Sequence, residues 1–171
     1  ALQPVYKSSG VSGMTQPVVL FDGTDRLNTA SFTTMTQPFT LAIVAKSTSG
    51  ITINSPMGDN SANYVGLSAR NDGKWLMYAN GGSLTTAGST TTWSVIVAVF
   101  NGASSFIYIN GTKTAISCGT GSFASGAAIG AWHSTLDLFS GYVGDAVGWS
   151  GGMSDANAAA ACADLQTVYG L

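Results

Sequence analysis

Residues 93–113 read WSVIVAVFNGASSFIYINGTK, which predicts two long strands joined by a tight turn, then a second turn into a third strand. Side chains alternate along a strand, so the odd-numbered residues from Trp93 to Val99 point to one face, while Ile96, Ala98 and Phe100 point to the other. Both sets are apolar. The pattern therefore predicts a central strand with both faces covered.

Two Asn-Gly pairs follow these strands, at Asn101-Gly102 and Asn110-Gly111. Asn-Gly supplies the positive φ angles of a type I′ hairpin turn, so each pair predicts a two-residue turn. Strand, turn, strand, turn predicts an antiparallel meander.

These residues resemble the laminin-G-like, or concanavalin-A-like, jelly roll, in which a tryptophan opens an apolar strand and a later strand ends in Tyr-Ile-Asn-Gly. The positions that carry the resemblance are Trp93, Asn101, Gly102, Tyr108, Ile109, Asn110 and Gly111. Residues 18–27, 139–150 and 154–171 resemble the same family, so almost the whole chain is covered. The resemblance implies an all-β, two-sheet antiparallel sandwich with a short C-terminal helix. This fold hosts enzymes, lectins and structural modules alike.

Residues 1–15 carry little alternation and predict an extended N-terminal arm, and residues 16–171 form the jelly-roll domain. Alternation and turn signals place further strands at residues 16–21, 39–46, 51–53, 64–69, 74–79, 83–86, 127–131 and 136–149. From residue 154 to 169 the period becomes helical, with Ser154 or Asp155 as N-cap and Gly170 as C-cap.

A formal charge of -2, 8% charged residues and no basic cluster argue against nucleic acid or an anionic membrane as a partner. No apolar run approaches the roughly 20 residues that span a bilayer. Ala1 fits either removal of an initiator Met or cleavage by a signal peptidase.

The two cysteines, Cys118 and Cys162, do not have the CxxC spacing of a metal site. Two reduced, packed thiols are favoured over a disulfide between a late strand and the closing helix.

Catalysis is not expected. Members of this fold that cleave β-glucans use a Glu-x-Asp-x-x-Glu strand motif, and this sequence contains no glutamate. Asp137 and Asp145 share the late strand region and are the remaining candidates for a carboxylate pair. His133 has no nucleophile motif beside it.

Relatives of this fold hold Ca²⁺ through Asp and Asn oxygens, and residues 57–63 are the best local supply, with Asp59, Asn60 and Asn63. Asx-rich loops are also ordinary turns, and neither an EF-hand pattern nor a carboxylate cluster is present. We expect no cofactor and no resident metal, with Ca²⁺ as the less favoured alternative.

Trp132 and His133 follow Gly130 and are expected at a loop tip, where an exposed tryptophan could stack on a sugar. Packing of Trp132 over a sheet edge is favoured over this exposed position, and Trp75, Trp93 and Trp149 are expected in the core. We predict a surface site for a cell-surface glycan in the loops 57–63 and 130–135. Its residues are Asp59, Asn60, Asn63, Trp132 and His133.

Two functional classes fit these observations. A compact, charge-poor jelly roll is similar to the small domains on bacteriophage virions, as capsid decoration or fibre-tip proteins. Its partners would be capsid or fibre proteins, sister copies and cell-surface glycans, and its location the virion surface. The alternative is a secreted, extracellular microbial carbohydrate-binding module. We favour the virion hypothesis, which rests on analogy of fold.

Overall fold

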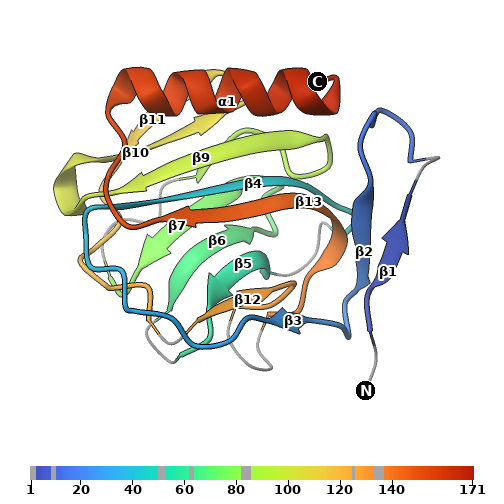
Figure 1. The fold of residues 1–171 in the computed structure, drawn as a ribbon, viewed down its shortest axis with the longest axis horizontal. Helices are drawn as coiled ribbons and strands as arrows, with labels where there is room; N and C mark the ends of the chain where they lie inside the picture. The colour runs from blue at the N-terminus through green and yellow to red at the C-terminus, as the bar shows by residue number, and fades with distance from the viewer. Residues whose placement is uncertain are drawn as a thin grey trace.

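The computed structural model describes residues 3–8, 11–49, 53–61, 64–81, 86–124, 126–132 and 137–171. Two antiparallel sheets lie face to face, and the helix α1 (Asp155–Tyr169) lies along the outer side of one of them (Figure 1). The predicted two-sheet β-sandwich with a C-terminal helix is confirmed.

The seven-stranded sheet carries the predicted meander at one edge. Its strands are, in order across the sheet, β1 (Val5–Lys7), β2 (Val18–Asp22), β13 (Ser140–Trp149), β4 (Phe39–Ser47), β9 (Ser94–Phe100), β10 (Ser105–Ile109) and β11 (Thr112–Ile116). At the other edge β1, from the predicted arm, pairs with β2 in the register Val5 to Leu20.

The six-stranded sheet faces it across the core. Its strands are, in order, β3 (Leu27–Asn28), β12 (Ala127–Ile129), β5 (Asn54–Asp59), β6 (Val65–Ala69), β7 (Trp75–Ala79) and β8 (Thr86–Ala87). The hairpin expected around Asn71-Asp72-Gly73 joins β6 to β7, with Ala69 opposite Trp75.

Strand β9 has the two apolar faces predicted from its alternation. Ile96, Ala98 and Phe100 belong to the main core between the sheets. Val95 and Val97 belong to a second core beneath α1, together with Ala158 and Cys162 of the helix. Strand β4 divides in the same way, because Leu41 and Ile43 face the main core while Ala42 and Val44 face the helix.

Helix α1 begins and ends where its caps were predicted. The Ser154 hydroxyl accepts a hydrogen bond from the Asn157 amide at 3.3 Å, and Gly170 has the left-handed φ of 73° that ends a helix. Asp155 in the first turn pairs with Lys113 at 2.7 Å and accepts a hydrogen bond from the Tyr108 hydroxyl at 2.9 Å. Lys113, then Tyr108, lower the pKa of Asp155. These contacts tie the start of the helix to β10 and β11.

The two Asn-Gly pairs behave differently. Asn110 and Gly111 have φ angles of 48° and 80° and join β10 to β11 as the predicted two-residue turn. Asn101, in contrast, has a φ of -152°, and Gly102 begins a 3₁₀ turn, Gly102–Ser104, between β9 and β10. The prediction of a type I′ turn at residues 101–102 is wrong, because four residues rather than two connect these strands.

Two other strand predictions also need correction. Only Ile53 of the predicted strand 51–53 lies within the described residues, and it precedes the strand. Strand β5 includes Met57, Gly58 and Asp59, which were expected in a loop. Trp75 and Trp93 are buried as expected, but Trp149 is not a core residue, since 36% of it is exposed.

Cys118 and Cys162 are both free thiols, as the sequence favoured. Cys118 lies in the core between the sheets, and Cys162 lies beneath the helix on the other side of the seven-stranded sheet. Burial raises the pKa of both thiols, which disfavours the reactive thiolate. Within the described residues, no helix has the length and apolar character needed to cross a membrane.

The Asn110 side chain fixes the meander, which gives a first prediction. Its Oδ1 accepts a hydrogen bond from the Val95 amide at 2.7 Å, and its Nδ2 donates to the Trp93 carbonyl at 3.0 Å. Asn110→Ala should lose these two hydrogen bonds. It should also carry the conformational free-energy cost of an alanine at a left-handed φ. The control Asn80→Ala shares only the φ cost, because Asn80 has a φ of 49°.

Chemical denaturation measures the two costs. We expect Asn80→Ala to lower the free energy of unfolding by about 1 kcal/mol, and Asn110→Ala to lower it by about 1–2 kcal/mol more. Equal costs would show that the side-chain bonds of Asn110 contribute nothing to the meander.

Candidate functional site

The outer face of the six-stranded sheet carries a hollow that we name the aromatic pocket. In β7, Trp75 and Met77 point into the core, so the alternate residues Leu76 and Tyr78 point outward. The pocket has a volume of about 220 Å³. It is lined by Ile53, Tyr64, Leu76, Tyr78, Trp132 and Asp137.

Trp132 reaches the pocket because the chain after β12 passes directly over β5. A side chain at Gly58 would lie 2.0 Å from the Trp132 carbonyl oxygen, so glycine is required there. The Gly130 amide also donates a hydrogen bond to the Pro56 carbonyl at 2.9 Å, and the Ser55 amide donates to the Asp137 carbonyl at 2.9 Å. Strand β5 thus holds both described ends of this connection.

Three aromatic rings meet in the pocket. The Trp132 ring lies 5.9 Å from the Tyr78 ring and 6.3 Å from the Tyr64 ring, centroid to centroid. Tyr64 is exposed and Tyr78 is half-buried, so both present ring surface to the solvent. Flat aromatic surface of this kind suits a ligand with an apolar face.

Trp132 is packed against the protein, as the sequence favoured, and is not an exposed stacking platform. Only 4% of it is accessible, because it packs on β5 and against the two tyrosines. Its indole Nε1 is buried and has no hydrogen-bond acceptor in the described structure. By comparison, the Trp75 Nε1 donates to Ser94 Oγ at 2.9 Å and the Trp93 Nε1 to the Ser12 carbonyl at 3.1 Å. A buried indole N–H without an acceptor is uncommon.

Backbone strain accompanies this pocket. Tyr64 has a φ of 52° and Asp137 a φ of 50°. Asparagine and aspartate tolerate this left-handed region, but a tyrosine rarely adopts it, and such strain concentrates at functional sites. The fold therefore holds the Tyr64 ring over the pocket against the preference of its backbone.

Asp59 supports this arrangement from beneath. Its carboxylate is fully buried, accepts a hydrogen bond from the Val65 amide at 3.4 Å, and accepts another from the Ser61 hydroxyl. These bonds fix the connection from β5 to β6 that carries Tyr64. Asp59 is therefore buried beneath the pocket.

The predicted site residues are thus only partly brought together. Trp132 lines the aromatic pocket, Asp59 is buried below it, and Asn60 is half-buried with its amide donating to the Gly126 carbonyl at 3.0 Å. Asn63 and His133 lie outside the described residues. A role of these five residues in glycan binding stays a prediction. Sequence analysis missed Tyr64 and Tyr78. The alternation of β7 could have indicated Tyr78, because it places this side chain on the opposite face of the strand from Trp75 and Met77.

The candidate carboxylate pair is not assembled. Asp137 lines the aromatic pocket on the six-stranded sheet. Asp145 lies in β13 of the seven-stranded sheet, where its amide donates to the Tyr169 hydroxyl at 2.8 Å. Asp137 belongs to the segment between β12 and β13, where its carbonyl accepts a hydrogen bond from the Ser55 amide of β5, so the two aspartates lie in different parts of the sandwich. In the described parts of the chain, no group of three or more His, Cys, Asp or Glu residues could hold a metal ion.

No protein-family model matches the sequence, and no curated protein sequence matches it. Solved structures do resemble the fold. Domain 4 of AbnA, an extracellular arabinanase from Geobacillus stearothermophilus solved in complex with arabinotriose, has a TM-score of 0.69 at 11% identity over 94% of this chain and 81% of that chain.

Two further structures belong to larger or oligomeric proteins. The heptameric SAP-like pentraxin from Limulus polyphemus has a TM-score of 0.61 at 14% identity, over 85% of this chain and 81% of that one. The Trypanosoma rangeli sialidase in complex with the inhibitor DANA has a TM-score of 0.61 at 13% identity, over 90% of this chain but only 28% of the sialidase. These similarities show the fold. They agree with a concanavalin-A-like sandwich.

Trp132 is buried and Trp149 is partly exposed, and this difference gives a second prediction. Trp132→Ala should lower the free energy of unfolding by about 3–5 kcal/mol, the usual cost of truncating a buried aromatic residue. Trp149→Ala should cost only about 1–2 kcal/mol, because its ring remains partly in solvent. Urea unfolding followed by circular dichroism measures both. A larger cost for Trp149→Ala than for Trp132→Ala would contradict the burial described above.

Proposed function

We propose that this domain binds carbohydrate without cleaving it, and that the ligand occupies the aromatic pocket. The observation that carries the proposal is the cluster of Trp132, Tyr64 and Tyr78 on the outer face of the six-stranded sheet. Sugar rings have apolar C–H faces that pack on aromatic rings, and hydrogen-bonding groups at the rim orient them. Asp137 supplies a carboxylate at this rim.

The volume and charge of the pocket narrow the ligand class. At about 220 Å³ the pocket is smaller than the roughly 300–1,000 Å³ of sites for drug-sized molecules, so it fits one sugar ring rather than a chain. Among the described residues that line it, Asp137 is the only charged one, and none is Lys or Arg. Anionic sugars are usually recognised through Arg or Lys. The proposed ligand is therefore a neutral sugar at the end or side of a glycan.

The structures that resemble this fold support a carbohydrate ligand, but they do not specify which sugar it is. The arabinanase domain was solved with arabinotriose, which is a neutral sugar. The sialidase was solved with an inhibitor, and it shares only the fold with this chain. For this chain, the sugar class rests on the residues of its own pocket.

We propose that the protein is located on the surface of a bacteriophage virion. The alternative is a secreted carbohydrate-binding module. One observation favours attachment to a larger assembly: β1 is an edge strand whose Tyr6 is 65% exposed, next to an exposed Val5. Unpaired edges with apolar side chains are ready to pair with another chain. Mass spectrometry of purified phage particles tests the setting. Recovery of the protein only from particle-free culture medium would favour the secreted module.

A glycan array tests the binding site. Tyr78→Ala should weaken binding to any neutral glycan that the parent protein binds by roughly 30-fold, since losing a central aromatic contact costs about 2 kcal/mol. Tyr6→Ala, which removes an exposed tyrosine far from the pocket, is the matched control and should bind like the parent. Equal binding by the parent and Tyr78→Ala, with both folded, would move the site elsewhere. A parent that binds no glycan would refute the proposal.

The same array tests specificity. Neutral glycans should bind more tightly than their sialylated counterparts, because Asp137 repels a carboxylate in the ligand. In Asp137→Asn this discrimination should shrink. Preferential binding of sialylated glycans by the parent would contradict the assignment of a neutral ligand.

The absence of catalysis is tested separately. Incubation with the bound glycans should release no reducing ends, because the sequence has no glutamate, and because Asp137 lines the aromatic pocket while Asp145 is in β13 of the other sheet. Turnover that disappears in Asp137→Asn would show that the domain is an enzyme.

A further inference from the structure

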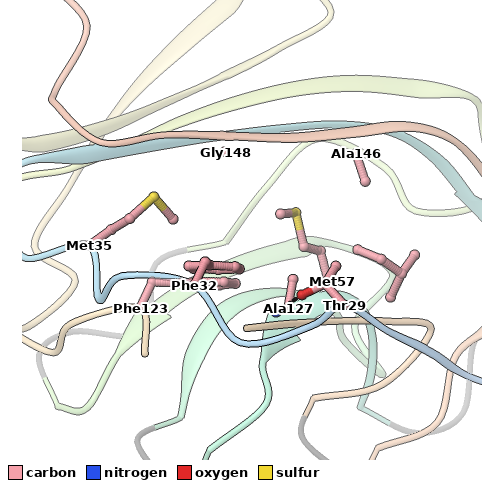
Figure 2. A pocket seen from close by; sticks show the side chains of 9 residues that line it. Thr29, Phe32, Met35, Met57, Phe123, Ala127, Ala146 and Gly148 are labelled. Atoms are coloured by element: carbon pink, nitrogen blue, oxygen red, sulfur yellow. Dashed lines mark hydrogen bonds between the residues drawn. The ribbon is translucent and has the colours of Figure 1, made fainter. Parts of the chain in front are cut away.

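A second pocket lies between the two sheets, on the opposite side of the six-stranded sheet from the aromatic pocket. We name it the inter-sheet pocket; Figure 2 shows it below β13 and behind the segment that leads from β3 to β4. Its volume is about 240 Å³. It is lined by Thr29, Phe32, Met35, Met57, Phe123, Ala127, Ile129, Ala146 and Gly148.

The pocket exists because the facing strands carry small residues here. Ala146 and Gly148 of β13 oppose Ala127 of β12, whereas sheets in a sandwich normally fill this space with interdigitating side chains. A side chain at Gly148 would point into this space, since its Cβ would lie 3.2 Å from the Met35 methyl group and 3.4 Å from Leu41. The backbone of Gly148 does not need glycine, because its φ is not in the left-handed region.

The lining offers a ligand almost no polar group. Among the described lining residues, Thr29 has the only side-chain hydroxyl, which donates to the Ala30 carbonyl at 3.0 Å and accepts from the Ala127 amide at 2.8 Å. Water needs several polar partners to be stable in a cavity, and a sugar needs them as well. This lining therefore excludes the neutral sugars proposed for the aromatic pocket.

The mouth of the pocket carries an aromatic ring. Phe32 is 39% exposed and stacks parallel to the buried Phe123 ring, with centroids 6.1 Å apart and an interplanar angle of 2°. In Figure 2 the two phenylalanines lie together, between Met35 on one side and Met57 on the other. Methionine side chains adapt their shape to apolar ligands.

We propose that the inter-sheet pocket binds a small uncharged apolar molecule of about the size of one aromatic ring. An engineered apolar cavity of about 150 Å³ stays dry and binds benzene, and this pocket is larger and open at one side. The inference is independent of the proposed carbohydrate function, because the two pockets lie on different faces of the six-stranded sheet and share no residue.

Benzene is the probe, and the methionine methyl signals of the intact chain report its location. Titration should shift the signals of Met35 and Met57 in a saturable way. Met77 lies in the same core but does not line the pocket, and Met14 and Met153 pack near the helix, so these three are internal controls. At about five times its Kd, benzene should raise the melting temperature by roughly 2–4 °C.

Filling the pocket should abolish both effects. Ala146→Leu places a larger side chain in the hollow, and Ala160→Leu makes the same change on the exposed face of the helix as the matched control. If Ala146→Leu does not fold, Gly148→Ala is the milder filling variant and should weaken binding. Absence of a saturable shift in the parent, or an unchanged shift in the folded filling variant, would overturn the proposal.

Discussion

The seven-stranded sheet has two apolar faces, and the rest of the structure depends on covering both. In β4 and β9, even and odd side chains alike are buried, so each face needs a separate partner. The six-stranded sheet covers one face, and α1 covers much of the other through Ala158, Cys162 and Tyr169. The outer face of the six-stranded sheet is then free of the helix, and the aromatic pocket lies on that face.

The sequence predicted the fold where the pattern is local. The alternation of β9, the turn at Asn110-Gly111 and the helix caps all depend on neighbouring residues, and they were confirmed. The predictions at Asn101-Gly102 and at residues 57–59 were wrong, because the composition of those segments resembles a turn while their structure is set by distant contacts. Gly58 is in a strand beneath the Trp132 backbone, which is a contact 74 residues away in sequence.

The site was harder to predict than the fold for a similar reason. Burial of a tryptophan depends on what packs over it. The packed position favoured for Trp132 was confirmed, but Trp149, which was expected in the core, is partly exposed. Tyr78 could have been found from the alternation of β7, but the left-handed backbone of Tyr64 carries no signature in the sequence. Gly58 and the backbone of Trp132 do meet, and the described surface beside them is formed by the rings of Tyr64, Tyr78 and Trp132.

The indole N–H signals of the four tryptophans in a ¹H–¹⁵N spectrum test the central claim most directly, which is that the aromatic pocket holds the sugar. Trp132 Nε1 has no acceptor among the residues that the structure describes, whereas the N–H groups of Trp75 and Trp93 are already bonded within the protein. Titration with the tightest-binding neutral glycan should move the Trp132 signal and leave those of Trp75, Trp93 and Trp149 in place. Saturable binding that leaves the Trp132 signal unchanged, or that moves Trp149 instead, would contradict the account.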